Sequence, residues 1–356
     1  MSTVPEYFGS LVFDTRVMKA RLSADVYRSL KHTIQKGAKL DPSVANAVAA
    51  AMKDWAVENG ATHFTHWFQP MTGITAEKHD SFISPAPDGG VNLLFCKGPD
   101  EYCGITSNNL FTGEMVRHNL DLALAAAETL RQEEPERYAA LGLTEKETEG
   151  WRKLREAIPV PRDPATGRLW PDDTFHLLEP VDPAALKEGD EASYHKVCFD
   201  RLQRYQVIKQ ADTLLLMTRL PDRFTGEEKK NAWEEFEPKC LHDSTLSFAS
   251  HALFAAQNGY DDAAWRYFEK ALYLDLREVM GNTGKEGLHL AGLGETWQAA
   301  VFGFAGLRFG PQGPTLSPRL PTGWKSLRFR FYWRGRLYEA RADQKSGDVV
   351  PCEADF

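Results

Sequence analysis

The sequence has little that would place it in a membrane or on a nucleic acid. No stretch approaches the roughly 18 consecutive apolar residues of a membrane-spanning helix, and the N-terminal residues lack the charged-then-apolar layout of a signal peptide. Clusters of lysine and arginine are also missing, and the net charge is −8. Since nucleic-acid and anionic-membrane binders present basic surfaces, we expect a cytoplasmic protein with small-molecule or protein partners.

Cysteine is scarce and irregularly spaced. No CxxC pair occurs, so reduced thiols are expected rather than disulfides or structural zinc. The histidines His63 and His66 lie three apart in THFTHWF, which is typical of a strand. Residues three apart in a strand point to opposite faces, so we expect no metal site there.

A boundary is expected between about Asp88 and Lys97. Acidic and basic side chains balance in residues 1–90, so the negative net charge lies downstream. Upstream, Ser23 can cap a helix to about Lys36, and Asp41 can cap a second helix that Gly60 ends. The second helix has one apolar stripe, formed by Val44, Val48, Met52 and Trp55.

These upstream segments carry a family resemblance. YFGSLVFDTRVMKARL, LDPSVANAVAAAMKDWAVENGATH and HWFQPMTGITAEKHDSFISP resemble the start of a type III glutamine synthetase, over residues 5 to about 90. That family's ATP-, glutamate- and metal-binding residues lie mostly further downstream. The resemblance therefore implies a segment that does not make glutamine by itself and acts at most through oligomer contacts.

Downstream, Gly98-Pro99 forces a loop that carries Glu101, ahead of a helix expected from near Thr112. From the residues alone, Glu101 is either a solvated loop acid or a proton donor. Further helices are expected over residues 114–132, 144–157 and 192–219. Lys209 and Gln210 would then lie on one face of the last helix.

Two later stretches place hydroxyls and small residues beside helix starts. In HDST, Ser244 with Thr245 can form an anion cradle, or Ser244 can simply be an N-cap. In GLHLAGLGETW, Gly294 and Thr296 are expected at a helix start, with His289 upstream.

Together GPDEY, KQAD, HDS and GLH resemble glycoside hydrolase family 65, over about residues 96–345. The resemblance implies a mainly α fold, a partial (α/α)6 barrel at 96–310 after a small α+β segment at 1–90. The alternating run KSLRFRFYWRGRLYEARA predicts an antiparallel hairpin around Arg334-Gly335, which is similar to the family's small C-terminal β-domain, here at 311–356. The resemblance also implies Glu101 as the general acid and Lys209 and Gln210 on sugar hydroxyls. The implied phosphate-binding residues are Ser244, Thr245, His289, Gly294 and Thr296.

The implied reaction is inverting phosphorolysis of an α-glucoside to β-glucose 1-phosphate, with inorganic phosphate as co-substrate and no cofactor or metal. Glu295 stands where the family commonly has glycine, so a family 65 hydrolase with Glu295 as its base is the alternative. The family's N-terminal β-sandwich and first barrel helices have no counterpart. We therefore expect a fusion of two partial sequences, with impaired or no activity, open to homo-oligomer formation.

Overall fold

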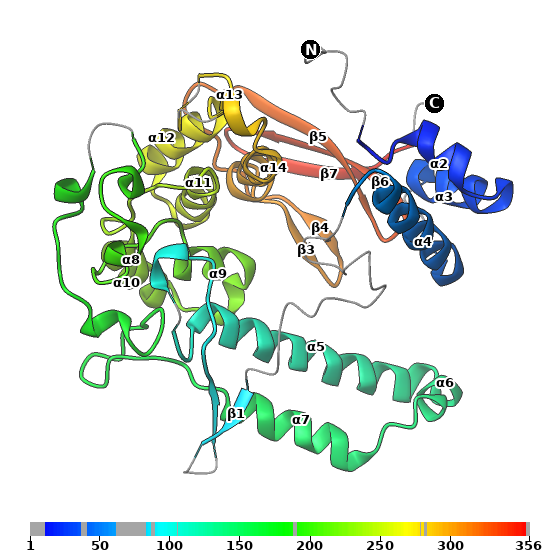
Figure 1. The fold of residues 1–356 in the computed structure, drawn as a ribbon, viewed down its shortest axis with the longest axis horizontal. Helices are drawn as coiled ribbons and strands as arrows, with labels where there is room; N and C mark the ends of the chain where they lie inside the picture. The colour runs from blue at the N-terminus through cyan, green and yellow to red at the C-terminus, as the bar shows by residue number, and fades with distance from the viewer. Residues whose placement is uncertain are drawn as a thin grey trace. The chain divides into compact units, whose positions relative to one another are not determined.

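The computed structural model describes residues 11–36, 41–61, 83–86, 90–104, 106–187, 191–277, 279–280 and 283–353 (Figure 1). The chain folds into two compact units. The first comprises Met1–Ser81 with Tyr332–Leu337, and the second comprises Phe82–Phe331 with Tyr338–Phe356.

The described residues of the first unit form the helices α2 (Thr15–Arg21), α3 (Ala24–Lys36) and α4 (Pro42–Glu58). As predicted, α4 begins after Asp41, whose carboxylate accepts the N–H of Ser43 at 2.8 Å. Gly60 follows the helix with a φ of 89°, a conformation that favours glycine. The expected strand with His63 and His66 lies outside the described residues.

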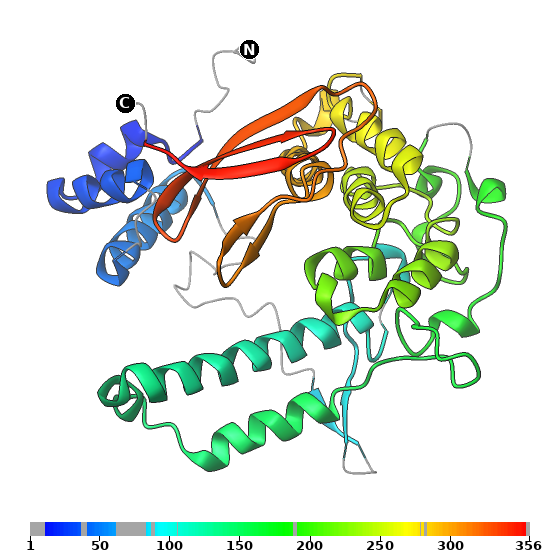
Figure 2. The same cartoon turned by 180° about the vertical axis from the view of Figure 1, so that it is seen from behind.

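The second unit is mainly helical, and α11 lies at its centre (Figures 1 and 2). Residues 247–256 of this helix are all buried, and it packs against α9, α12, α14 and the π-helix Ala299–Phe304. The described helices are α5 (Leu110–Glu133), α6 (Pro135–Ala140), α7 (Glu145–Ala157), α8 (Phe199–Leu202), α9 (Thr213–Arg219), α10 (Gly226–Phe236), α11 (Ser247–Asn258), α12 (Asp261–Leu272), α13 (Thr283–Glu286) and α14 (Leu290–Gln298). None of these, nor α2 to α4, is long and apolar enough to cross a bilayer.

Helices α5 and α7 run side by side as an arm that ends at α6 (Figures 1 and 2). The predicted start of α7 is confirmed, because Thr144 and Glu147 form a reciprocal capping box. Arg155 of α7 joins Asp121 of α5 at 2.9 Å, and Arg223 pairs with the same carboxylate. The arm is therefore tied to the helical core through Asp121.

Among the described residues, three small sheets lie wholly or mostly in the second unit. Strands β1 (Ile83–Pro85) and β2 (Val91–Leu93) form one antiparallel pair, and β3 (Arg308–Gly310) and β4 (Gly313–Thr315) form another. The third sheet has the order β5 (Ser326–Trp333), β6 (Arg336–Asp343), β7 (Gly347–Pro351). The predicted turn between β5 and β6 is confirmed, with positive φ at both Arg334 and Gly335.

The predicted helix over residues 192–219 is wrong in most of its length. Its described part contains a 3-10 turn at Ser193–His195, the short α8 and then irregular chain up to α9. Ile208 instead forms a parallel bridge with Cys240. Helical spacing was misleading here because Leu202 and Val207 pack in a cluster with Tyr102 and Leu241, while Ile208 pairs with Cys240.

Gly306 lies where the π-helix gives way to β3, and its φ is 63°. A Cβ atom at this position would lie 2.2 Å from the carbonyl oxygen of Ser317. We expect Gly306→Ala to lower the free energy of unfolding by more than about 1 kcal/mol, measured by urea unfolding.

Gly150→Ala is the matched control. Gly150 is inside α7, and a Cβ there meets nothing within 4 Å. The control should gain stability, by about 0.5–1 kcal/mol, from better helix propensity. Equal urea midpoints for the two variants would contradict the strain assigned to Gly306.

Candidate functional site

Glu101 lies in the loop that precedes α5, as predicted. It begins a 3-10 turn, Glu101–Cys103, whose cap is Asp100. The carboxylate of Glu101 is half exposed and forms an ion pair with the ammonium of Lys209. That ammonium also lies 5.4 Å from the ring centroid of Tyr194. Two of the predicted site residues, 108 positions apart in sequence, are therefore in direct contact.

A buried carboxyl group positions this pair. Oδ1 of Asp100 accepts the backbone N–H of Lys209 at 2.7 Å and that of Tyr102 at 3.1 Å. The amide of Gln210 donates to the carbonyl oxygen of Pro99 at 2.8 Å. Its Oε1 atom is buried with no hydrogen-bond partner among the described residues, so it can still accept a hydrogen bond.

The KQAD segment (residues 209–212) also contacts the HDST segment (residues 242–245). Leu241 donates its N–H to the carbonyl of Ile208 at 2.9 Å, and Asp243 donates to that of Lys209 at 3.1 Å. The Tyr102 hydroxyl donates to Oδ2 of Asp243 at 2.7 Å, and Lys187 Nζ lies 3.0 Å from Oδ1. Three motifs are therefore held together by backbone and side-chain hydrogen bonds.

The GLH segment (residues 287–297) packs against the HDST segment. Gly292 of α14 lies so close to Thr245 that a Cβ there would be 3.0 Å from the Thr245 carbonyl oxygen. His289 precedes α14, and Asp275 accepts its backbone N–H at 2.8 Å. Nδ1 of His289 lies 2.6 Å from the other oxygen of Asp275. Asp275 therefore fixes the orientation of the His289 ring.

The expected helix start at Gly294 and Thr296 is wrong. Helix α14 begins at Leu290, so both residues lie in its interior. Gly294 is exposed, whereas Thr296 is buried and its hydroxyl donates to the carbonyl of Gly292 at 2.8 Å. Unpaired helix N–H groups are therefore expected in the first turn after His289 rather than at Gly294.

Ser244 does not cap α11 directly. The cap position is Leu246, and the Ser244 hydroxyl accepts the N–H of Leu246 at 3.3 Å in the turn before the helix. Ser244 and Thr245 are both half-buried.

Glu295 is neutralised within the protein. One carboxylate oxygen lies 2.8 Å from the guanidinium of Arg219, and the other accepts the Ser250 hydroxyl at 2.8 Å. Burial raises the pKa of Glu295, and the two partners oppose that shift. The carboxylate therefore has partners on both oxygens and little exposure.

Two aspartates lie buried behind the Glu101 loop. Burial raises the pKa of Asp100 to about 8 and that of Asp212 to about 7. Oδ2 of Asp212 accepts the N–H of Asp100 at 3.4 Å. Gly98 is required beside them, because a Cβ there would lie 2.2 Å from Oδ2 of Asp212.

Among the described residues, one group has metal-ligand atoms within 4.8 Å of one another, namely Cys240, His242 and His251. Nδ1 of His242 lies 2.8 Å from the Ser247 hydroxyl, and Nε2 lies 3.2 Å from that of Tyr267. Nδ1 of His251 donates to the Ser247 carbonyl at 2.8 Å. These hydrogen bonds give the group a structural role beneath the HDST turn.

Sequence reasoning identified Glu101 and Lys209 but missed the residues that position them. Asp100, Tyr102 and Asp243 form that support, and each lies next to or within a motif already singled out. The position of these polar residues directly beside Glu101 and Ser244 is the signal that could have identified them. Lys187 has no such signal in the sequence.

The raised pKa of Asp100 predicts a pH effect on stability. The folded state keeps this proton up to about pH 8, whereas an unfolded aspartate loses it near pH 4, so stability should fall as the pH rises between them. Burial lowers the pKa of His251 to about 4, which acts in the opposite direction below its ordinary value of 6.5. The window from pH 6.5 to 8 therefore isolates the aspartates.

Between pH 6.5 and pH 8, the free energy of unfolding should fall by about 1 kcal/mol more for the unmodified chain than for Asp100→Asn. Asparagine keeps an acceptor oxygen for Lys209 and Tyr102 but does not titrate. Urea unfolding at several pH values measures the difference. Parallel pH profiles for the two proteins would show that Asp100 does not hold a proton in the folded state.

Three family models match the chain. The glycosyl hydrolase family 65 central catalytic domain matches residues 89–298, and the family 65 C-terminal domain matches residues 307–349. The glutamine synthetase type III N-terminal model matches residues 4–98. Both resemblances noted in the sequence are therefore confirmed.

Curated relatives include an alpha,alpha-trehalose phosphorylase of Geobacillus stearothermophilus, 37% identical over 269 residues, 74% of this chain and 35% of the relative. A kojibiose phosphorylase of Halothermothrix orenii is 33% identical over 242 residues, 67% of this chain and 31% of the relative. The chain thus spans about a third of the length of these relatives.

Among solved structures, a putative kojibiose phosphorylase from human microbiome superimposes with a TM-score of 0.66 at 23% identity, over 77% of this chain and 38% of that one. The mainly helical fold, part of an (α/α)6 barrel followed by small antiparallel sheets, is confirmed. With more than half of its residues matched by the central catalytic model, the chain belongs to glycosyl hydrolase family 65.

Proposed function

We propose that the chain carries the acid and phosphate-binding parts of an inverting α-glucoside phosphorylase. The reaction converts an α-glucoside and inorganic phosphate to β-glucose 1-phosphate and a free sugar, with no cofactor or metal. The observation that carries the proposal is the contact between Glu101 and Lys209, held by Asp100, beside the HDST segment against which the GLH segment packs. The names of the two curated phosphorylases agree with this reaction class.

In this proposal Glu101 protonates the departing glycosidic oxygen. Its half-exposed position leaves it accessible to a substrate. Glu101 contacts the ammonium of Lys209, so the substrate has to separate the pair before Glu101 can reach the glycosidic oxygen. Lys209 is then free to donate to a sugar hydroxyl, and Oε1 of Gln210 can accept from one.

Phosphate attacks the anomeric carbon from the face opposite the leaving oxygen. The C–O bond to the leaving sugar breaks as the phosphate C–O bond forms, and the proton from Glu101 ends on the leaving hydroxyl. His289, oriented by Asp275, and the hydroxyls of Ser244 and Thr245 are the proposed phosphate ligands. Gly294 leaves the surface of α14 uncovered, since nothing lies within 4 Å of a Cβ placed there. Thr296 holds the first turn of α14 through its hydrogen bond to the carbonyl of Gly292.

Hydrolysis by the same site has less support. A hydrolytic base must accept a proton from water, yet both oxygens of Glu295 already have partners in Arg219 and Ser250. The ion pair with Arg219 also removes the repulsion that a free carboxylate would exert on phosphate. Glu295 thus fits a phosphorylase as a structural residue.

A second candidate function concerns the N-terminal segment. The match to the glutamine synthetase type III N-terminal model supports association of this segment with glutamine synthetase subunits. The segment contributes none of the eight residues proposed for the sugar site. In this case the chain would be a fusion whose first part acts only through oligomer contacts.

We expect Glu101→Gln to reduce phosphate release from β-glucose 1-phosphate, with a panel of acceptor sugars, by at least roughly 100-fold. Glutamine keeps the size of the side chain but cannot donate the proton. Glu136→Gln, an exposed change on α6, is the matched control and should keep the original rate.

Circular dichroism and cooperative thermal unfolding establish that each protein in this comparison is folded. Equal rates for folded Glu101→Gln and for the unmodified chain would contradict the acid assignment. If the folded unmodified chain releases no phosphate with any acceptor of the panel, the phosphorylase proposal is contradicted.

His289→Asn tests the phosphate ligands separately. We expect the KM for phosphate in the phosphorolysis direction to rise about tenfold or more, with a smaller change in kcat, because a ligand of the ground-state anion is lost. His118→Asn, on the α5 arm, provides a control histidine. An unchanged KM for phosphate would remove His289 from the phosphate site.

A further inference from the structure

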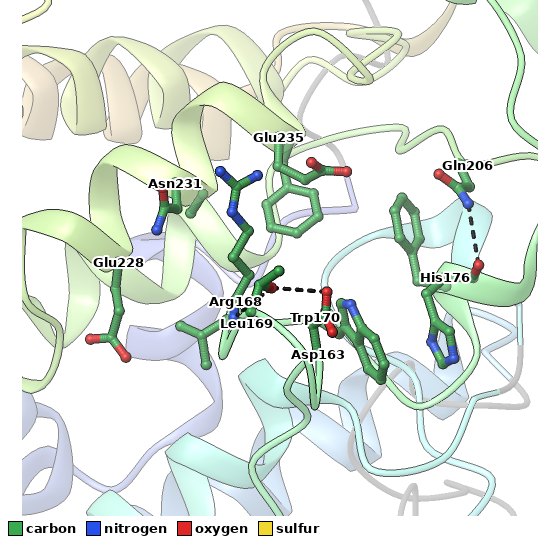
Figure 3. A pocket seen from close by; sticks show the side chains of 13 residues that line it. Asp163, Arg168, Leu169, Trp170, His176, Gln206, Glu228, Asn231 and Glu235 are labelled. Atoms are coloured by element: carbon green, nitrogen blue, oxygen red, sulfur yellow. Dashed lines mark hydrogen bonds between the residues drawn. The ribbon is translucent and has the colours of Figure 1, made fainter.

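A pocket in the same unit contains none of the eight residues proposed for the sugar site. It is a cavity of about 220 Å³ bordered by the loop around Trp170, by Gln206 and by one side of α10 (Figure 3). We call it the Trp170 pocket. Ligand pockets for drug-sized molecules measure roughly 300–1,000 Å³, so this volume suits a single small ring.

An aromatic pair forms one wall of the Trp170 pocket. The rings of Trp170 and His176 are stacked, with centroids 3.7 Å apart and an interplanar angle of 9°. The amide of Gln206 donates to the backbone carbonyl of His176 at 3.4 Å (Figure 3) and to that of Leu178 at 3.1 Å, which fixes this stretch of chain. The wall is therefore already in place before any ligand arrives.

The floor of the pocket is apolar. Leu169, Phe175 and Phe236 are buried, and the rings of Phe175 and Phe236 meet edge to face at 5.9 Å. The apolar C–H face of a pyranose ring can cover such a surface. A fully polar ligand such as a free inorganic ion gains nothing from it.

Two polar side chains at the rim have no partner within the described chain. Neither the guanidinium of Arg168 nor the amide of Asn231 takes part in any hydrogen bond or ion pair there, and both border the pocket (Figure 3). An amide offers both donors and an acceptor, and a guanidinium offers several donors in one plane. Adjacent hydroxyls of a sugar match this set.

The other charged groups at the rim are already engaged. Asp163 accepts the N–H of Ala165 and the hydroxyl of Thr166, both at 2.8 Å. Glu228 pairs with Arg162 at 2.8 Å, and Glu235 pairs with Lys239. These carboxylates hold the rim rather than a ligand.

The charged groups that line the pocket indicate whether its ligand is an anion, a cation or a neutral molecule. Three carboxylates, of Asp163, Glu228 and Glu235, and the guanidinium of Arg168 border the pocket, and Arg162 and Lys239 pair with two of the carboxylates. The charges at the rim therefore nearly balance, so an anion meets no net positive charge here. A cation could not use the donors of Arg168 and Asn231. A neutral polyhydroxyl ring fits both the charge and the free donors.

We propose that the Trp170 pocket binds one neutral hexopyranose unit of a sugar, as a second carbohydrate site apart from Glu101. The pocket would hold one end of an oligosaccharide or keep a sugar close to the enzyme. The assignment does not depend on the reaction proposed for Glu101.

The test follows the tryptophan itself in the full-length chain. The protein is labelled with 5-fluorotryptophan, its nine tryptophan signals are recorded by fluorine NMR, and Trp170→Phe identifies the Trp170 signal. Maltose, a neutral sugar with two hexopyranose rings, is titrated. We expect the Trp170 signal to shift and saturate.

Asn231→Leu removes the amide while keeping a similar volume, and it should weaken the apparent affinity about tenfold, or about 1.4 kcal/mol. Lys230→Leu, on the neighbouring exposed position of α10, is the matched control and should leave the titration unchanged. Lys209→Met should also leave it unchanged, which separates this pocket from the site at Glu101.

Three outcomes would overturn the proposal. A Trp170 signal that does not move with maltose shows that no sugar binds. An equal shift with sodium sulfate shows an anion site at Arg168 instead. Loss of the titration in folded Lys209→Met shows that the signal reports the site at Glu101.

Discussion

The arrangement of the site depends on one buried carboxyl group, that of Asp100. It accepts backbone N–H groups from two segments, at Lys209 and at Tyr102, and so fixes the loop of Glu101 against the KQAD segment. Tyr102 then extends the link to Asp243 in the HDST segment. Because Asp100 is almost fully buried, these hydrogen bonds are protected from competition with water.

Several acids near the site are paired with cations. Glu295 is paired with Arg219, Asp243 with Lys187, and Glu101 with Lys209. The buried aspartates Asp100 and Asp212 form no ion pair with any described residue, and burial raises the pKa of both. The raised pKa values favour the protonated form of Asp100 and Asp212 near neutral pH, so the interior behind the Glu101 loop carries less negative charge than its composition suggests.

Local features of the fold could be predicted from the sequence. The starts of α3, α4 and α7 follow from capping residues, and the turn at Arg334-Gly335 follows from alternation in the flanking strands. The segment before α9 could not be predicted, because the bridge between Ile208 and Cys240 replaces helical hydrogen bonds with long-range ones. Periodicity in a short window carries no information about such a partner.

The candidate site was predictable only in part. The family resemblance named Glu101, Lys209 and His289, and the structure places the first two in contact and the third on the segment that packs against Thr245. Their catalytic and binding roles stay predictions. The protonation of Asp100 and the pairing of Glu295 could not be foreseen, because both depend on burial and on neighbours that are distant in sequence. The Trp170 pocket likewise combines a loop with one side of α10.

The hydrogen bonds that assemble the site also bear on which parts of the chain fold first. The bond from Lys209 to Asp100 closes a loop of 109 residues, and that from Tyr102 to Asp243 closes one of 141. Closing loops of this length costs chain entropy before the contact returns any energy. Short-range structure such as the capped helices and the pair α11 and α12 can form without that cost. The geometry around Glu101 is therefore a late product of the helical core, and conditions that loosen the core affect the site before they melt individual helices.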